Sequence, residues 1–202
     1  MKQGLMIVIS GPAGSGKGTV DAHLLATGDY VYSVSATTRA PRKGEKDGVN
    51  YHFITKEDFL TSIEAGEMLE YTEYCGNFYG TPKKAAEAVL ASGKNLILEL
   101  EVEGAKNVKA RYPDAILILL LPPSFATQEA RLRGRASETE EKILERLAQT
   151  KKELLEAEHY DYIVYNRDGA DREAANEIQA ILTAERASLR RNPGVAERYF
   201  AD

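Results

Sequence analysis

The chain has 202 residues, a length that fits one globular domain with insertions. Hydrophobic residues make up 43% of it and charged residues 28%, a composition that excludes a disordered or fibrous protein. The formal net charge of −5 excludes the strongly basic domain of a general nucleic-acid binder, so we expect no nucleic-acid partner. It does not exclude a small anionic ligand, because net charge does not say where the arginines lie.

The apolar runs of the chain are short. The longest, Leu5–Ile9 and Ala115–Leu121, are far below the roughly 20 residues that span a bilayer. The first run leads directly into a glycine-rich turn, which is not the layout of a signal peptide. The single cysteine, Cys75, excludes an intrachain disulfide and a cysteine cluster for a metal. We therefore expect a cytoplasmic protein with no membrane partner, and the sequence leaves its oligomeric state open.

Continuous apolar runs predict the strands of a parallel sheet that is covered on both faces. These runs are Leu5–Ile9, Tyr30–Val34, Leu96–Leu100, Ile116–Leu121 and Tyr162–Tyr165. Helical patterns follow at Val20–Ala26, at Ala105–Ala110, from the capping box Ser137-x-x-Glu140 onward, and at Ile178, Ile181, Leu182 and Leu189. Strands that alternate with helices predict an α/β core.

Two intervals interrupt this alternation. The first has half-exposed strands at Tyr51–Ile54 and Met68–Tyr74, a helix at Glu57–Ala65 capped by Thr55, and a helix from Pro82 to Gly93. The second is charged and mostly helical. We therefore divide the chain into a core of residues 1–38, 93–123 and 160–202, a small α+β insertion of residues 39–92, and a helical lid of residues 124–159.

The segment after the first predicted strand has the pattern G-x-x-x-x-G-K of a phosphate-binding loop. Its glycines allow the positive φ angles that turn backbone N–H groups toward a phosphate, and the following helix adds the positive end of its dipole. The residues of this loop are Gly11, Pro12, Ala13, Gly14, Ser15, Gly16, Lys17, Gly18 and Thr19. Gly18 stands where a Ser or Thr usually contacts Mg²⁺, so the hydroxyl of Thr19 is a candidate for the metal or for a phosphate.

A second group of residues suggests another phosphate site. Arg39 and Arg42, joined by the stiff Pro41, can fork onto one phosphate, and Tyr51 and Tyr79 can each add a hydroxyl donor. Taken singly, the arginine pair is also compatible with solvated surface, and each tyrosine with packing.

These residues belong to a string, Ser35-Ala-Thr-Thr-Arg39-Ala-Pro-Arg42-Lys-Gly-Glu45-x-Asp47-Gly-x-x-Tyr51-x-Phe53, that resembles the signature of the guanylate kinase family. Later segments resemble that family in order and spacing: Glu70-Tyr, Gly76-Asn-Phe-Tyr79-Gly80-Thr81, Glu99-Leu-Glu101-Val-Glu-Gly104 and Gly134-Arg135. The resemblance implies one domain over residues 3–183. Its fold class would be α/β, a P-loop NTPase-type parallel sheet flanked by helices, with an insertion that binds the nucleoside monophosphate and a helical lid.

The resemblance also implies an activity, the transfer of the γ-phosphoryl group of ATP to GMP with Mg²⁺ as the cofactor of ATP. The GMP-binding residues would be Ser35, Arg39, Arg42, Tyr51, Glu70, Tyr79, Thr81 and Glu99. The ATP-binding residues would be the loop of residues 11–19, Arg135 and Asn166. The catalytic residues would be Lys17, Arg39, Arg135 and Arg146, and the metal residues Thr19 and Glu101. The family commonly has aspartates where Glu99 and Glu101 stand, so we expect Glu101 to act through water.

Glu70 has a physical reason to select guanine. A carboxylate accepts hydrogen bonds from guanine N1–H and the 2-amino group together, whereas adenine offers neither donor and would leave a buried carboxylate unpaired. Asn166 and Asp168 match the segment that borders the adenine in the family. The arginines of Arg131-Leu-Arg133-Gly-Arg135 are compatible with phosphate binding by the lid or with a solvated basic turn.

Three other functions are compatible with parts of this sequence. A non-enzymatic domain of the same fold predicts a damaged phosphate loop, but Lys17, Arg39 and Glu70 are all present. A kinase of another phosphorylated sugar or nucleotide is disfavoured by Glu70 and Thr81. A GTPase switch is disfavoured because the chain lacks the Asn-Lys-x-Asp string with which such switches read guanine.

Overall fold

The structure is a computed structural model, and it describes residues 3–42, 44–74, 76–134 and 139–201. Cys75, Arg135 and Ser137 therefore lie outside the described residues, and the expectations that fall on them stay predictions.

Five parallel strands form the central sheet, in the order β2-β7-β1-β8-β9. They are β1 (Met6–Ser10), β2 (Tyr30–Tyr32), β7 (Asn95–Glu99), β8 (Ile116–Leu121) and β9 (Tyr162–Tyr165). The predicted strands are all present, each within about two residues of the expected bounds. The prediction of a parallel α/β core is confirmed.

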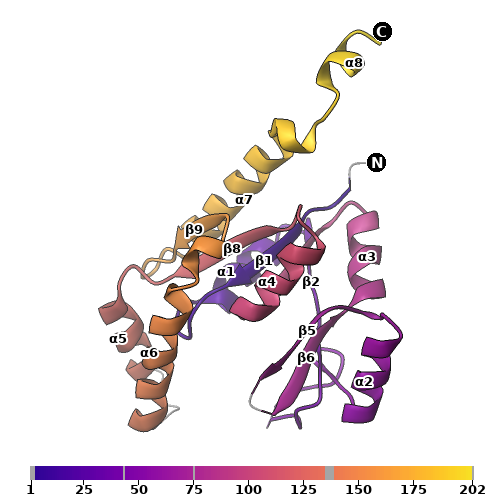
Figure 1. The fold of residues 1–202 in the computed structure, drawn as a ribbon. Helices are drawn as coiled ribbons and strands as arrows, with labels where there is room; N and C mark the ends of the chain where they lie inside the picture. The colour runs from indigo at the N-terminus through magenta and orange to yellow at the C-terminus, as the bar shows by residue number, and fades with distance from the viewer. Residues whose placement is uncertain (1–2, 43, 75, 135–138, 202) are drawn as a thin grey trace.

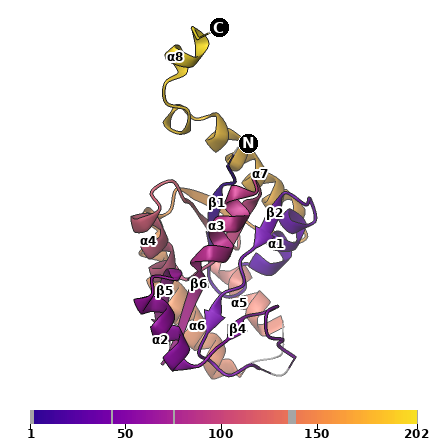
Figure 2. The same cartoon turned by 90° about the vertical axis from the view of Figure 1, so that its right-hand side faces the viewer.

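Helices cover the two faces of this sheet (Figures 1 and 2). On one face lie α1 (Lys17–Leu25) and α7 (Asp171–Ala187), and on the other α3 (Lys83–Ala91) and α4 (Val102–Arg111). Successive side chains of a strand point to opposite faces, so Ile7 packs with α1 and α7 while Val8 packs with α3 and α4. The edge strand β9 departs from the prediction, because Ile163 and Tyr165 are partly exposed and only one of its faces is well covered.

The parallel strands bring their C-terminal ends to one edge of the sheet. Ser10 ends β1, Glu99 ends β7, and Asn166 directly follows β9. Sheets of this kind bind ligands in the crevice beyond these ends, which is where the residues singled out in the sequence are brought together.

A smaller, four-stranded sheet lies beside this edge, in the order β4-β3-β6-β5. Its elements are β3 (Ala36–Thr37), β4 (His52–Phe53), β5 (Met68–Tyr74), β6 (Asn77–Pro82) and the helix α2 (Lys56–Glu64). Phe59 of α2 is fully buried against this sheet, and Thr55 caps the helix by accepting a hydrogen bond from the amide of Asp58, as predicted. Helix α3 was expected to begin at Pro82; it begins one residue later, at Lys83, and Pro82 is its N-cap.

Two helices form a hairpin on the opposite side of the same edge, α5 (Phe125–Gly134) and α6 (Glu140–Leu154), followed by the short η1 (Ala157–His159). Ile143 and Leu147 of α6 pack against Leu132 of α5, as their spacing predicts. Helix α6 begins at Glu140 and Thr139 is its N-cap. The predicted cap at Ser137 lies outside the described residues and stays a prediction. The apolar face also ends earlier than expected, because Leu155 is exposed.

The C-terminal residues extend beyond the sheet. Helix α7 ends at Ala187 and is followed by η2 (Leu189–Arg191), whose arginines pair with Glu185 of α7. The last helix, α8 (Val195–Tyr199), stands away from the rest of the molecule (Figures 1 and 2). The prediction that Leu189 packs on the sheet is wrong: it lies past the end of α7 and is 76% exposed. No helix in the described part of the chain has the length and apolar character needed to cross a membrane.

Candidate active site

The loop between β1 and α1, the P-loop (residues 11–19), needs glycine at several positions. Gly14 and Gly16 both have φ of 86°, in the left-handed region that other residues rarely adopt. A Cβ atom at Gly16 would lie 2.3 Å from Nδ2 of Asn166, and one at Gly11 would lie 2.1 Å from the backbone oxygen of Leu120. The loop is therefore both turned sharply and packed closely against β8 and the segment after β9.

Contacts from distant parts of the chain fix the backbone of the P-loop. Asn166 Nδ2 donates to the carbonyl of Ser15 (2.9 Å), Gln128 Nε2 to that of Ala13 (2.9 Å), and Arg131 Nη1 to that of Gly14 (3.1 Å). Gln128 also donates to Thr150 Oγ1 (2.7 Å), which ties α5 to α6. The α5–α6 hairpin is thus bonded directly to the loop.

Two arginines of the basic segment have partners within the protein. Arg131 donates to Asp168 Oδ1 through Nε (3.0 Å) and Nη2 (2.7 Å), and also to the carbonyl of Asn166. Arg133 pairs with Glu129 and Glu140. In this structure Arg131 supports the P-loop, and Arg133 forms ion pairs on the surface. Arg146 of α6 faces the cleft described below.

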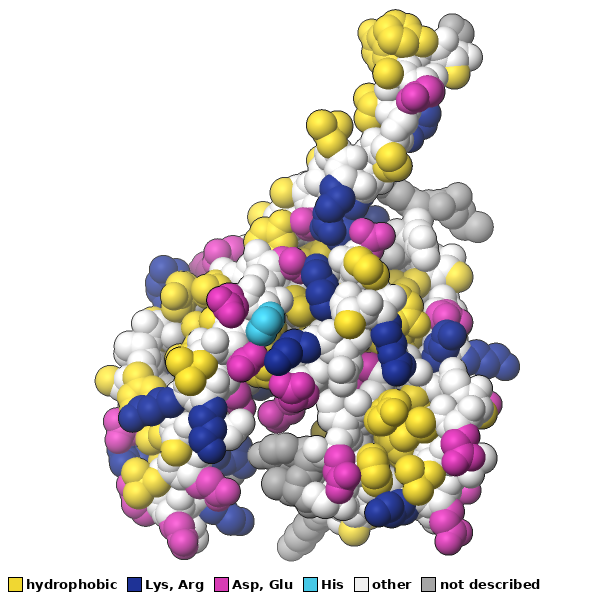
Figure 3. All heavy atoms as spheres, in the orientation of Figure 1, with side chains coloured by type: hydrophobic (Ala, Val, Ile, Leu, Met, Phe, Trp, Pro, Cys, Tyr) yellow, Lys and Arg dark blue, Asp and Glu magenta, His cyan; other side chains and the backbone are white. Residues whose placement is uncertain are grey.

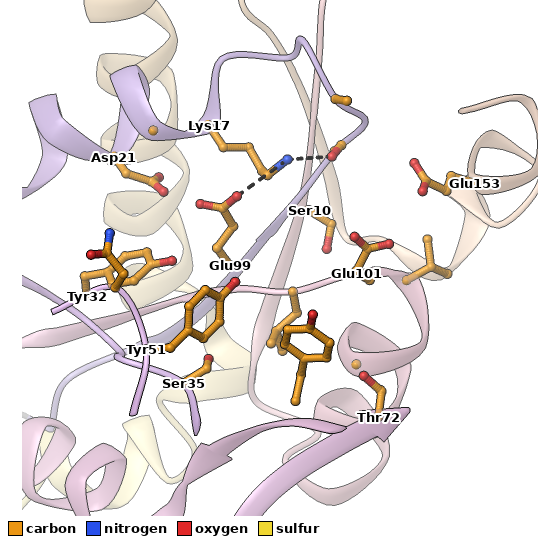
Figure 4. Close-up of a pocket in the computed structure, with 18 of the residues that line it drawn as sticks. Ser10, Lys17, Asp21, Tyr32, Ser35, Tyr51, Thr72, Glu99, Glu101 and Glu153 are labelled. Atoms are coloured by element: carbon orange, nitrogen blue, oxygen red, sulfur yellow. Dashed lines mark hydrogen bonds and ion pairs between the residues drawn. The ribbon is translucent and has the colours of Figure 1, made fainter. Parts of the chain in front are cut away.

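Lys17, the first residue of α1, points into the space between the two sheets (Figure 4). Its Nζ donates to the carbonyl of Gly11 (2.7 Å) and lies 3.6 Å from Oε1 of Glu99. Thr19 lies on the exposed side of the loop, where its hydroxyl donates to the carbonyl of Gly16 (2.8 Å). The lysine is therefore directed toward the cleft, and the threonine lies outside it.

The expected monophosphate site lies on the small sheet and the loop that follows β3. Arg39 Nη2 donates to both carboxylate oxygens of Glu45 (2.9 and 3.0 Å), and the same carboxylate accepts from the amide of Arg42 (2.7 Å). The guanidinium of Arg39 lies over the ring of Tyr51, 5.5 Å from its centroid, and the ring of Tyr79 lies 6.0 Å from that of Tyr51. In this structure the charge of Arg39 is thus paired with that of Glu45, and the two arginines and two tyrosines line the same cleft.

The expected base pocket is buried beside that surface. Glu70 on β5 is 2% exposed, and its Oε1 accepts a hydrogen bond from Thr81 Oγ1 on β6 (2.8 Å). Burial raises the pKa of the Glu70 carboxyl to about 7, although the hydrogen bond from Thr81 acts in the opposite direction. A Cβ atom at Gly104 of α4 would lie 3.3 Å from Oε2 of Glu70, so a side chain there would crowd the carboxylate.

One acidic residue was missed by the sequence reasoning. Asp21 lies one helical turn after Lys17 on α1, and it is 3% exposed. Neither of its carboxylate oxygens has a hydrogen-bond partner among the described residues. Burial and, second, the nearby carboxylate of Glu99 raise the pKa of Asp21 to about 7, against the opposing effect of Lys17. The only signal in the sequence was its spacing from the lysine of the P-loop.

A single cleft of about 1060 Å³ joins these groups. The molecule is hollowed between the α5–α6 hairpin and the small sheet, and this hollow is visible in Figure 3. The expected site residues that line the cleft are Gly11, Ala13, Lys17, Gly18, Ser35, Arg39, Arg42, Tyr51, Glu70, Tyr79, Glu99, Glu101 and Arg146. The expected site residues outside that set are Pro12, Gly14, Ser15, Gly16, Thr19, Thr81 and Asn166, and Arg135 lies outside the described residues.

A parallel sheet with a glycine-rich loop and a lysine at its C-terminal edge, which shares a cleft with two arginines and two tyrosines, defines the P-loop class of proteins. Comparison with known proteins specifies the family. The family model described as guanylate kinase matches residues 3–185. The chain therefore belongs to the guanylate kinase family.

Similar proteins match over nearly the whole chain. A guanylate kinase of Halalkalibacterium halodurans is 49% identical over 98% of this chain and 95% of its own length. A guanylate kinase of Clostridioides difficile is 43% identical over 100% of this chain and 98% of its own. The crystal structure of guanylate kinase from Anaplasma phagocytophilum is similar with a TM-score of 0.76 and 34% identity, over 98% of this chain and 94% of that one.

Proposed function

We propose that this protein transfers the γ-phosphoryl group of ATP to GMP, giving ADP and GDP, and so recycles GMP in purine nucleotide metabolism. The observation that carries the proposal is that one cleft joins Lys17 of the P-loop to Glu70, a buried carboxylate bonded to Thr81. The first supports binding of the donor phosphates, and the second supports selection of a guanine base. ATP and GMP are then the small-molecule partners.

The acceptor site recognises GMP at both ends. Arg39, Arg42 and the hydroxyls of Tyr51 and Tyr79 bind its phosphate, and the carboxylate of Glu70 accepts from guanine N1–H and the 2-amino group. Ser35 and Glu99, which also line the cleft, complete the GMP contacts. Adenine, which lacks both donors, would leave the carboxylate of Glu70 buried without a partner, at a cost of about 1–3 kcal/mol.

The donor site is the P-loop together with the α5–α6 hairpin. Backbone N–H groups and the N-terminus of α1 bind the phosphates of ATP, and the hydroxyl of Thr19 suits a phosphate on the outer side of the loop. Arg146 of α6 and Arg135 contribute charge from the hairpin, and Asn166 acts here by holding the carbonyl of Ser15. We assign GMP binding to residues 39–92 and the lid to residues 124–159.

Mg²⁺ bound with ATP would neutralise negative charge on the phosphates that react. The donor set of the cleft suits this ion, because the carboxylates of Glu99 and Glu101 line it and Mg²⁺ takes oxygen ligands. Mg²⁺ is usually held by one or two carboxylates, substrate phosphates and water, and Glu101, an exposed residue that lines the cleft, suits a contact through water.

The chemistry then depends on positioning and charge. The phosphate of GMP is already an anionic oxygen nucleophile near neutral pH, so the protein needs no general base. Its task is to hold two anionic groups in line against their mutual repulsion. Lys17 and Arg39 act from opposite walls of the cleft, with Arg135 and Arg146 from the hairpin, and arginines in this role contribute about 10³–10⁵ in rate. Closure of the cleft would exclude water as a competing acceptor.

An ADP-release assay with ATP and Mg²⁺ and with GMP, AMP, CMP or UMP in turn tests the proposal. We expect turnover with GMP and at least a hundredfold less with the other three. A folded protein that releases no ADP with GMP would contradict the proposal. Faster release with another acceptor would favour a kinase of a different nucleotide, and GMP binding without any release would favour a non-enzymatic domain. The single cysteine suits a reducing compartment, so we place the reaction in the cytoplasm.

A further inference from the structure

Asp21 is a buried carboxyl group for which the reaction described above has no use. It lies on α1 beside the reacting end of the cleft, and it belongs to the residues that line the cleft. Figure 4 shows its carboxyl group directed toward that of Glu99, with Lys17 close to both. Among the described residues neither oxygen of Asp21 has a hydrogen-bond partner, whereas Lys17 is bonded to Gly11 and paired with Glu99.

This arrangement is unfavourable in a protein that binds two phosphorylated nucleotides. Burial of a carboxyl group without a partner costs free energy, and a carboxylate beside a phosphate adds repulsion between like charges. A cation between the carboxylates and the phosphates would remove both costs. The two acidic side chains and the unpartnered oxygens of Asp21 thus indicate a positively charged ligand at this place.

The P-loop of this chain provides a reason for such a ligand to be held from α1. Gly18 has no hydroxyl at the position where P-loops usually contact Mg²⁺, and Thr19 lies on the exposed side of the loop. Mg²⁺ commonly keeps several waters and is bound by one or two carboxylates together with substrate phosphates. Asp21 and Glu99 supply two carboxylates, and the cleft admits the phosphates.

We propose that Asp21 and Glu99 bind the water shell of the divalent cation that enters with ATP, and that they replace the hydroxyl missing at Gly18. When the cation binds, Glu99 contacts its water shell in place of Lys17. Nζ of Lys17 can then bind the phosphates. The proposal rests on the proposed function only in taking ATP as the nucleotide. Asp21 acts as a positioning residue, because it contacts the reacting phosphates through the cation and its waters.

Mn²⁺ serves as the probe, together with the non-hydrolysable ATP analogue AMP-PNP. Free Mn²⁺ is measured by electron paramagnetic resonance during titration of the full-length protein saturated with AMP-PNP. We expect Asp21→Asn and Glu99→Gln each to weaken Mn²⁺ binding about tenfold or more. The matched control is Glu153→Gln, which removes another carboxylate of the cleft, one that already accepts a hydrogen bond from Gln149 (3.3 Å). It should bind Mn²⁺ as the unchanged protein does.

A second titration separates cation binding from a structural role. In EDTA, Asp21→Asn should bind metal-free AMP-PNP as tightly as the unchanged protein or more tightly, because a negative charge near the phosphates has been removed. Asn has the shape of Asp and carries no charge, and Glu99 is partly exposed, so both variants should fold; equal melting temperatures check this.

Unchanged Mn²⁺ affinity in Asp21→Asn would overturn the proposal, and so would an equal loss of affinity for metal-free and metal-loaded AMP-PNP. If Asp21→Asn does not fold, Glu99→Gln decides alone by the same criteria. The proposed function fails separately: it is contradicted if the unchanged protein releases no ADP with GMP, whatever the Mn²⁺ titrations show.

Discussion

Glu70 is the residue on which the choice of base depends, and its burial makes that choice sensitive to pH. In the free protein burial raises its pKa to about 7, so that at pH 6 most molecules carry a neutral carboxyl group. A neutral carboxyl group has a hydroxyl where guanine needs an acceptor. Binding of guanine therefore requires that the proton leave.

The affinity for GMP should accordingly fall as the pH is lowered. We expect little change above pH 8 and a decrease of about tenfold per pH unit well below 7, because each bound GMP displaces one proton from Glu70. Calorimetric titration between pH 5.5 and 8.5 measures this. The phosphate of GMP also titrates near pH 6, so Glu70→Gln is the control. An identical pH profile in Glu70→Gln would contradict the assignment.

Replacement of Lys17 should impair phosphoryl transfer and spare GMP binding, because its amino group is bonded to Gly11 of the P-loop, which we assign to the donor phosphates. We expect Lys17→Ala to lower the rate of GMP-dependent ADP release at least about 10²–10³-fold and to leave the affinity for GMP nearly unchanged. Kinetics and GMP titration on the same variant test this. The exposed Lys84 on α3 is the control, and Lys84→Ala should behave as the unchanged protein. A large loss of GMP affinity in Lys17→Ala would be inconsistent with two separate phosphate sites.

At the scale of elements, α5 holds the P-loop in shape. Gln128 and Arg131 of this helix donate to the carbonyls of Ala13 and Gly14, and Arg131 is fixed in turn by Asp168. The geometry of the ATP site therefore depends on a helix far from it in the sequence.

Two arginines of α5 provide a matched pair for testing this support. Arg131→Met should weaken ATP binding about tenfold and lower the melting temperature, because Gly14 and Asp168 lose their partner. Arg133→Met breaks only exposed ion pairs, with Glu129 and Glu140, and should leave both properties unchanged. Titration with AMP-PNP and thermal unfolding give the comparison. Equal behaviour of the two variants would show that Arg131 does not support the loop.

The sequence predicted those elements whose signals are local. The parallel strands follow from continuous apolar runs, α2 from its cap at Thr55, and the P-loop from its glycines next to Lys17. The short strand β3 was not predicted, because Ala36–Thr37 has no apolar pattern and is held by pairing with distant strands. The cap at Thr139 was not predicted, because Ser137 and Thr139 are both residue types that suit an N-cap and the sequence alone does not choose between them.

The candidate site likewise has residues that the sequence could identify and residues that it could not. Lys17 and the Arg39–Arg42 pair could be identified from their immediate neighbours in the sequence. The bonds from Arg131 to Gly14 and from Asn166 to Ser15 could not, because each joins residues more than a hundred positions apart. The acidic pair of Asp21 and Glu99 is likewise formed only when α1 and β7 meet at the edge of the sheet.

At the scale of the whole molecule, residues 193–202, which we call the C-terminal arm, should be dispensable for the fold and for the activity. Among the residues that the structure describes, Arg198 of α8 donates to the nearby carbonyls of Pro193 and Asn192, and Tyr199 and Phe200 are largely exposed. The guanylate kinase family model also ends at residue 185. We expect removal of residues 193–202 to leave the melting temperature and the turnover of GMP unchanged.

A longer truncation should, in contrast, destabilise the protein. Removal of residues 188–202 also removes Arg190 and Arg191, which pair with the nearly buried Glu185 at 2.8 and 2.7 Å. The remaining carboxylate would be left with Tyr162 alone, and we expect a loss of about 1–3 kcal/mol in the free energy of unfolding. Equal melting temperatures of the two truncations would contradict this account of the arm.

The central claim is that one cleft passes a phosphoryl group from ATP to GMP. The most direct measurement uses ATP labelled with ³²P in the γ position, a single turnover with Mg²⁺ and GMP, and separation of the nucleotides. We predict that the label appears in GDP, and that replacement of GMP by AMP leaves it in ATP. Label in inorganic phosphate, or label that stays in ATP when GMP is present, would contradict the claim.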